Sequence, residues 1–133
     1  MSVSTFDPRG EIPIVEGDVW GPHGRQATLR LVLDSGSALT IISPGILDDL
    51  GYGARDGERI TRVQSAVGVE RGYTIRVKKF RALGFAFPEF LINAFDLPEY
   101  GDIDGLLGWD FLQRFNFEVR PREGSIVALP CPP

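Results

Sequence analysis

The sequence predicts a single, mainly β domain with one or two short helices. Apolar and polar residues alternate in residues 28–33, 73–78 and 115–120, the period of a strand with one face against a core. Sixteen glycines and ten prolines supply turns between such strands. With 133 residues, the chain is long enough for one core and too short for two domains.

Composition restricts the function classes. A formal net charge of -4 gives no electrostatic reason to expect nucleic acid or an anionic membrane as a partner, because both attract basic surfaces. The single cysteine, Cys131, cannot form an internal disulfide, which fits a reducing compartment. Residues 1–9 are polar and no apolar run approaches a membrane span. We therefore expect a soluble, cytoplasmic protein.

The N-terminal quarter is rich in glycine and polar residues. Residues 1–10 have the composition of a flexible arm, residues 11–15 are expected to form a first edge strand, and residues 17–26 are expected to form turns. His23, the only histidine, lies in these turns and is a poor candidate for a general base. The domain proper is expected to span residues 11–129.

A short helix is expected after the strand-like segment 40–43. Ser43 followed by Pro44 is typical of a helix start, and Gly51 is a suitable residue for the C-terminal cap. A hairpin is predicted for residues 59–79, where two alternating stretches flank four small residues. The tip residues are Ser65, Ala66, Val67 and Gly68.

The C-terminal half is expected to begin with two buried strands in residues 80–95, broken at Pro88, followed by an acidic loop. A short helix is predicted for residues 109–114, with Asp110 as a structural cap near its N-terminus. A terminal hairpin covers residues 115–129. Residues 130–133 form a loose, proline-rich tail.

The strand 28–33 ends at Asp34, which begins the tight turn Asp34, Ser35, Gly36. A carboxylate is costly to bury, so one at the end of an apolar strand is either a solvated turn residue or part of a site that uses it. Asp, Ser and Gly all favour turns, so the tripeptide alone leaves both interpretations open.

A second motif, about seventy residues later, favours the interpretation of Asp34 as part of a functional site. Two apolar residues, Leu106 and Leu107, lie between Gly105 and Gly108 and precede a helical segment. Together the two motifs resemble the retropepsin-like family of aspartic peptidases, over about residues 27–129. The resemblance implies a closed β-barrel, a flap hairpin that includes residues 65–68, and a homodimer.

The resemblance also implies roles for individual residues. Asp34 would be catalytic, with Ser35 bonding across the dimer axis, Gly36 letting its backbone approach the carboxylates, and Ser37 donating to an outer carboxylate oxygen. Gly105, Leu106, Leu107 and Gly108 would lie beneath the turn and support it. No cofactor or metal is expected, and the substrate would be an extended peptide or protein.

The proposed chemistry needs two carboxylates, one accepting a proton from water and one donating to the carbonyl. No other Asp in the chain is followed by Ser or Thr and then Gly. The second carboxylate would therefore be Asp34 of another copy, in a twofold dimer. Two alternatives stay open: a noncatalytic retropepsin-like module for peptide binding or dimerisation, and an unrelated β-barrel binding module with Asp34 as a turn residue.

Overall fold

A computed structural model describes residues 1–65, 68–97 and 102–130 of the chain. The elements are β1 (Ser2–Thr5), β2 (Ile14–Trp20), β3 (Gln26–Leu33), β4 (Ile41–Ile42), α1 (Pro44–Leu50), a 3-10 turn η1 (Ala54–Asp56), β5 (Arg59–Ser65), β6 (Gly68–Ala82), β7 (Phe85–Ala94), β8 (Gly105–Leu107), α2 (Trp109–Leu112), β9 (Phe115–Arg120) and β10 (Ser125–Pro130). The prediction of a mainly β domain with two short helices is confirmed.

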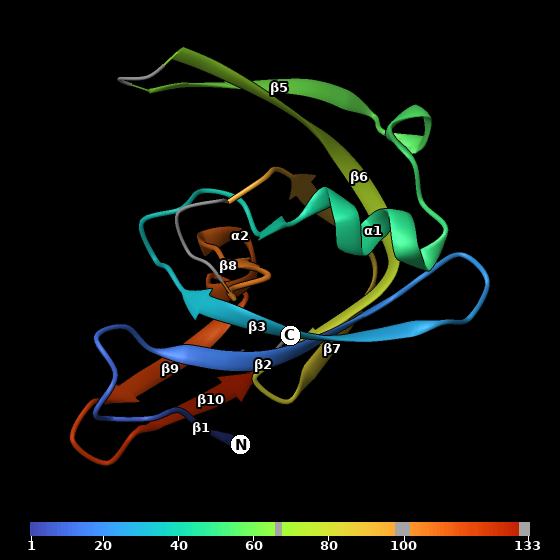
Figure 1. Cartoon of the computed structure of the whole chain (residues 1–133). Coiled ribbons are helices and arrows are strands. Elements are labelled where there is room, and N and C mark those ends of the chain that lie inside the picture. The colour runs from blue at the N-terminus through green and yellow to red at the C-terminus, as the bar shows by residue number, and fades with distance from the viewer. Residues whose placement is uncertain (66–67, 98–101, 131–133) are drawn as a thin grey trace.

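Six strands close into a barrel, in the order β2, β3, β8, β4, β7, β6, with β2 pairing back onto β6 (Figure 1). β3 pairs with β8 and β4 with β7 in parallel, and the other neighbours are antiparallel. β5 pairs only with β6 among the described strands, so the β5–β6 hairpin projects from the barrel. Closure removes the exposed edges that an open sheet of these strands would have.

The N-terminal residues differ from the predicted flexible arm. Ser2–Thr5 forms β1, which pairs with β10 in a separate three-stranded sheet of order β1, β10, β9. The alternation in this short polar segment is compatible with a strand, and pairing satisfies the backbone groups along one edge of β10. Pro130, expected in the tail, belongs to β10 and pairs with Phe115, while residues 131–133 lie outside the described residues.

The first long strand also differs from its predicted position. β2 runs from Ile14 to Trp20, so its second half occupies residues expected to form turns, and it pairs on both sides and is not an edge strand. Turns were predicted here partly because of Gly17. A Cβ at Gly17 would lie 2.6 Å from Leu31 Cδ1, so this glycine permits close packing inside the barrel and does not mark a turn.

The predicted break at Pro88 is wrong. β6 continues to Ala82, the chain turns at Leu83 and Gly84, and β7 extends from Phe85 to Ala94 through Pro88. Within β7, the pairing with β6 skips only Glu89, which has a positive φ of 50°. Proline is tolerated there because β4 pairs with β7 only at Asn93 and Ala94, so one side of the strand at Pro88 needs no ladder donor.

The first helix follows its sequence signals. Pro44 occupies its first turn, and Gly51 closes it in the left-handed conformation at φ 105°. Ser43 precedes the helix but makes no side-chain capping bond. Leu47 and Leu50 are the residues of α1 that are buried in the core.

An aromatic cluster holds α2 against the barrel. Phe111, which is fully buried, has its ring centroid 5.5 Å from that of Phe80, 5.4 Å from that of Phe87 and 5.4 Å from that of Phe115, each in edge-to-face geometry. Each such pair contributes roughly 0.5–1.5 kcal/mol beyond its buried area. The cluster therefore fixes the short helix that follows the second sequence motif.

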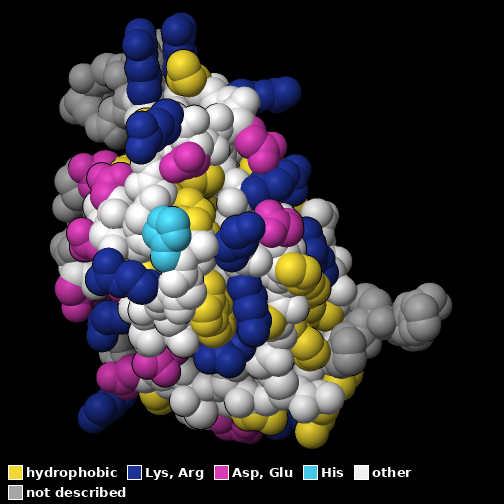
Figure 2. All heavy atoms as spheres, turned by 90° about the vertical axis from the view of Figure 1, so that its right-hand side faces the viewer, with side chains coloured by type: hydrophobic (Ala, Val, Ile, Leu, Met, Phe, Trp, Pro, Cys, Tyr) yellow, Lys and Arg dark blue, Asp and Glu magenta, His cyan; other side chains and the backbone are white. Residues whose placement is uncertain are grey.

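The surface around His23 carries both signs of charge. Figure 2 shows Lys and Arg side chains interspersed with Asp and Glu on this face. The described helices include none that is long and apolar enough to cross a membrane.

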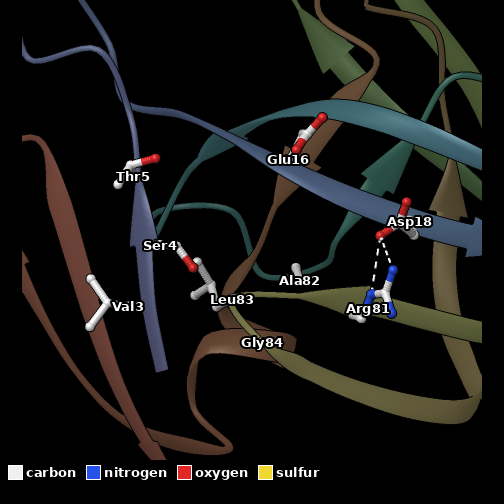
Figure 3. A pocket seen from close by; sticks show the side chains of 9 residues that line it. All are labelled: Val3, Ser4, Thr5, Glu16, Asp18, Arg81, Ala82, Leu83 and Gly84. Atoms are coloured by element: carbon white, nitrogen blue, oxygen red, sulfur yellow. Dashed lines mark hydrogen bonds and ion pairs between the residues drawn. The ribbon is translucent and has the colours of Figure 1, made fainter. Parts of the chain in front are cut away.

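On the outside of the barrel, the carboxylate of Asp18 on β2 hydrogen-bonds to side chains of the two neighbouring strands, β3 and β6. Asp18 accepts two hydrogen bonds from Arg81, at 3.1 and 2.8 Å (Figure 3). It also accepts one from Gln26 and one from Thr28, each at 3.0 Å. Its side chain is only 17% exposed. Burial opposes ionisation, but the hydrogen bonds and the Arg81 charge outweigh it and lower the pKa of Asp18 below its usual value.

We predict that Asp18→Asn lowers the free energy of unfolding by about 1 kcal/mol at pH 7. The folded pKa is depressed, so the stabilisation is present above the usual value of 3.8 and is lost as the pH falls through the lowered folded value. Urea unfolding of wild type and variant between pH 7 and pH 2 measures this. Glu16→Gln, an exposed carboxylate on the same face of β2, is the control. If wild type and Asp18→Asn still differ by the same free energy of unfolding at pH 2, the prediction is wrong.

Candidate active site

β3 delivers Asp34 to the end of the barrel. Leu29 and Leu31 are buried on its inner face, and the strand pairs in parallel with β8, Leu33 opposite Leu107. The Asp34 amide then donates to the Leu107 carbonyl at 3.0 Å. The two sequence motifs, about seventy residues apart, are therefore hydrogen-bonded neighbours.

The turn itself orients the carboxylate. Gly36 N donates to Asp34 Oδ1 at 3.0 Å, and Ser37 N donates to the Asp34 carbonyl at 3.1 Å. Asp34 is half-buried, whereas Ser35 and Gly36 are exposed. One carboxylate oxygen is thus fixed by backbone, and the group remains open to solvent on a face of the turn where another molecule can approach.

Ser37 does not make the bond that the resemblance implied. Its Oγ donates to the Leu39 carbonyl at 2.7 Å. A hydroxyl has one proton to donate, so Ser37 cannot at the same time donate to Asp34. Its hydroxyl stiffens the segment after the turn, and the backbone amide of Gly36 takes the place expected for a donor to the carboxylate.

The second motif lies against the segment that follows the turn. Leu106 and Leu107 are buried, and a Cβ at Gly105 would lie 2.0 Å from the Ile41 carbonyl oxygen. A Cβ at Gly108 would lie 2.5 Å from the Leu39 carbonyl carbon and oxygen. Neither glycine has a positive φ, so the backbone conformation does not require glycine at these positions. Glycine is required because the neighbouring backbone leaves no room for a Cβ.

Asp110 and Thr40 join the two motifs through side chains. Asp110 Oδ1 accepts from Thr40 N at 2.9 Å, from Thr40 Oγ1 at 2.8 Å and from Phe111 N at 2.8 Å. The Thr40 hydroxyl also accepts from Gly108 N at 3.2 Å, and Thr40 is fully buried. Asp110 thus bonds nearby backbone donors, as predicted, but the N-cap residue of α2 is Gly108 and makes no side-chain capping bond.

The role of Thr40 was missed by sequence reasoning. Its signal is a single hydroxyl inside the apolar run 38–42, since a buried hydroxyl needs partners. Backbone bonds add to the same junction, with Trp109 N donating to the Ser37 carbonyl at 2.7 Å and Asp110 N to the Ala38 carbonyl at 3.2 Å.

The predicted tip hairpin is present as β5 and β6. Ser65 pairs with Gly68 at the last described rung of the ladder. Ala66 and Val67, the other two residues assigned to the tip, lie outside the described residues.

A family model described as aspartyl protease matches residues 15–111, which include both motifs and the hairpin between them. The chain belongs to the aspartyl protease family. This membership removes the alternative of an unrelated β-barrel binding module.

The fold of the chain is retropepsin-like. It is similar to the crystal structure of a retropepsin-like aspartic protease from Rickettsia conorii, with a TM-score of 0.69 over 96% of each chain and 16% sequence identity. A comparison with curated proteins gave no match.

Asp104 and Asp110, the acidic residues on either side of the second motif, accept hydrogen bonds from other groups of the chain. Asp104 Oδ2 accepts from Arg30 N at 2.8 Å, and Asp110 is held by Thr40 and Phe111. In the described part of the chain, no group of three or more His, Cys, Asp or Glu side chains is arranged to hold a metal ion.

We predict that Asp110→Ala destabilises the fold by about 2–3 kcal/mol, because it leaves the buried Thr40 amide and hydroxyl without their acceptor. Asp110→Asn should cost less, because its amide oxygen still accepts. Chemical denaturation of the two variants measures the difference. Equal losses in both would show that the charge of Asp110, and not its acceptor geometry, holds the junction.

Proposed function

We propose that the protein is an aspartic endopeptidase whose active site combines Asp34 of two identical chains. The observation that carries this proposal is the solvent-accessible Asp34 turn, seated on the second motif through the Asp34 to Leu107 hydrogen bond. The engagement of Asp104 and Asp110 elsewhere supports the need for a second chain, because a dyad requires two carboxylates at one place.

In the proposed site the two Asp34 carboxylates face each other across a twofold axis. Two carboxylates about 3 Å apart share one proton, because they cannot both ionise. The ionised member accepts a proton from a water that attacks the peptide carbonyl, and the protonated member donates to the carbonyl oxygen. The Gly36 amide fixes the carboxylate orientation, and the exposed Ser35 hydroxyl bonds across the axis.

The β5–β6 hairpin is proposed as the flap. It projects from the barrel, and β5 pairs only with β6 among the strands of the described residues, so its other edge is available to an extended peptide (Figure 1). A peptide bound between hairpin and barrel would gain backbone hydrogen bonds as an added strand. Ser65, Ala66, Val67 and Gly68 would form the tip of this flap.

Exposed apolar side chains support association with a second copy. Val3 on β1 is 60% exposed, Leu129 on β10 is 45% exposed and Trp109 on α2 is 46% exposed. Trp109 directly follows the second motif, next to the Asp34 turn. We propose that this homodimer acts in the cytoplasm on a peptide or protein substrate, without a cofactor.

A noncatalytic peptide-binding or dimerisation module of the same family is the second candidate. It would hold a peptide between the β5–β6 hairpin and the barrel of the same dimer, without hydrolysis. The intact Asp34 favours the peptidase, because a binding module has no need of a solvent-accessible carboxylate at this turn.

We expect Asp34→Asn to abolish peptide cleavage while leaving fold and association unchanged. The substitution is nearly isosteric but removes the group that accepts a proton from water. Cleavage of a mixed peptide pool, followed by mass spectrometry, measures activity, and sedimentation measures association. Asp48→Asn on α1 is a matched control at an exposed position. Undiminished cleavage by Asp34→Asn would exclude Asp34 as the catalytic group.

Dilution tests the two-chain site. Below the dimer dissociation constant, activity should fall with the square of total chain concentration, because the competent species is the pair. Wild type mixed with a large excess of Asp34→Asn under exchange should lose activity per wild-type chain. An enzyme complete in one chain would keep that activity at any excess, which would overturn the dimeric site.

A further inference from the structure

A hollow of about 470 Å³ is lined by residues at the base of the β5–β6 hairpin and by Leu39, from the segment that follows the Asp34 turn. One wall is Leu39, which follows the turn and whose carbonyl accepts the Ser37 hydroxyl. Its remaining lining residues are Glu58, Arg59, Thr61, Thr74, Arg76 and Leu91. A peptide lying between flap and barrel would pass beside this hollow.

The arrangement of strands explains which side chains reach it. Arg59 and Thr61 are two residues apart on β5, so they share one face, and Ile60 and Arg62 share the other. Arg59 lies opposite Thr74 on β6. The face of the hairpin base that lines the hollow is therefore polar. Leu91 on β7 pairs with Arg76, so its side chain lies on the same face of the sheet, and with Leu39 it adds an apolar part to the lining.

The charges in the hollow do not balance. Arg76 Nε pairs with Glu58 Oε2 at 2.9 Å, and both side chains are about half exposed, at 50% and 47%. Arg76 Nη1 also donates to the Glu89 carbonyl at 3.4 Å. Arg59 is exposed, and no carboxylate of the described residues lies within ion-pair distance of it. The hollow thus has two guanidinium groups and one carboxylate.

We propose that this hollow is a specificity pocket for an acidic substrate side chain, with Arg59 as the residue that binds the carboxylate. Leu39 and Leu91 would contact the methylene groups, which favours glutamate over the shorter aspartate. A guanidinium is suited to this role, since its planar fork matches a carboxylate. This inference rests on the proposed function, because it assigns substrate preference to the same site.

The proposed twofold symmetry gives the pocket a further property. Each dimeric site would contain two copies of the hollow, one from each chain. An extended peptide crossing the site would therefore meet an Arg59 on either side of the scissile bond. We expect cleaved sequences to be enriched in glutamate at two positions, at equal distances from the cut.

The cleavage test uses pairs of peptides from a wild-type digest that differ only by Glu or Gln at the enriched positions. We expect wild type to favour Glu by about tenfold in kcat/KM, the size of a charge-assisted hydrogen bond. Arg59→Gln should remove this preference, and Arg59→Glu should make Lys preferred over Glu. Arg62→Gln makes the same charge change on the opposite face of β5 and should keep the preference.

A binding test separates this inference from the proposed function. Asp34→Asn, with and without Arg59→Gln, is incubated with a randomised octapeptide library, and bound peptides are sequenced by mass spectrometry. Enrichment of glutamate that depends on Arg59 supports the pocket even if wild type cleaves nothing, which would overturn only the peptidase.

Three results would overturn the pocket itself. They are cleavage without acidic preference, a preference that Arg59→Gln leaves intact or that Arg62→Gln removes equally, and a bound fraction without glutamate enrichment. Thermal melting of each Arg59 variant checks that a lost preference does not come from lost folding.

Discussion

The site depends on one buried interaction, the pairing of the Thr40 hydroxyl and amide with the Asp110 carboxylate. Thr40 is fully buried, so loss of Asp110 would leave the Thr40 amide and the Thr40 hydroxyl proton without an acceptor. The same hydroxyl accepts the Gly108 amide, which joins the strand after the Asp34 turn to the start of α2. The turn is held in place from below, by groups that take no part in the proposed chemistry.

This support explains how a half-exposed carboxylate is kept in one orientation. The backbone of Asp34 is held by two hydrogen bonds, because its carbonyl accepts from Ser37 N and its amide donates to the Leu107 carbonyl. Its side chain accepts a hydrogen bond at Oδ1 from Gly36 N. Close backbone contacts at Gly105 and Gly108 leave no room for the junction to shift. Rigidity therefore comes from packing beneath the turn, and the carboxylate itself stays accessible.

The sequence predicted the parts of the fold that follow from local pattern. Alternation located the strand before Asp34, and Pro44 with Gly51 located α1. It failed where distant packing decides, since Gly17 fits against Leu31 and Pro88 lies where β7 lacks a second neighbour. The sequence also revealed the Asp34 turn and the second motif, each from its own local pattern. Their hydrogen bond, the Thr40 link and the Ser37 bond to Leu39 required coordinates, because each joins atoms whose distance no local pattern encodes.

Symmetry has an energetic consequence for the proposed dimer. Every supporting contact would occur twice in one site, so a substitution that displaces the turn displaces both carboxylates. Dyad chemistry depends on the separation of the two groups, and the two displacements act on that one distance. A defect at Thr40 or Asp110 that one chain tolerates as a small loss of stability would thus impair the assembled site more severely. In the proposed dimer, the buried junction would therefore be under a stricter constraint than the stability of a single chain requires.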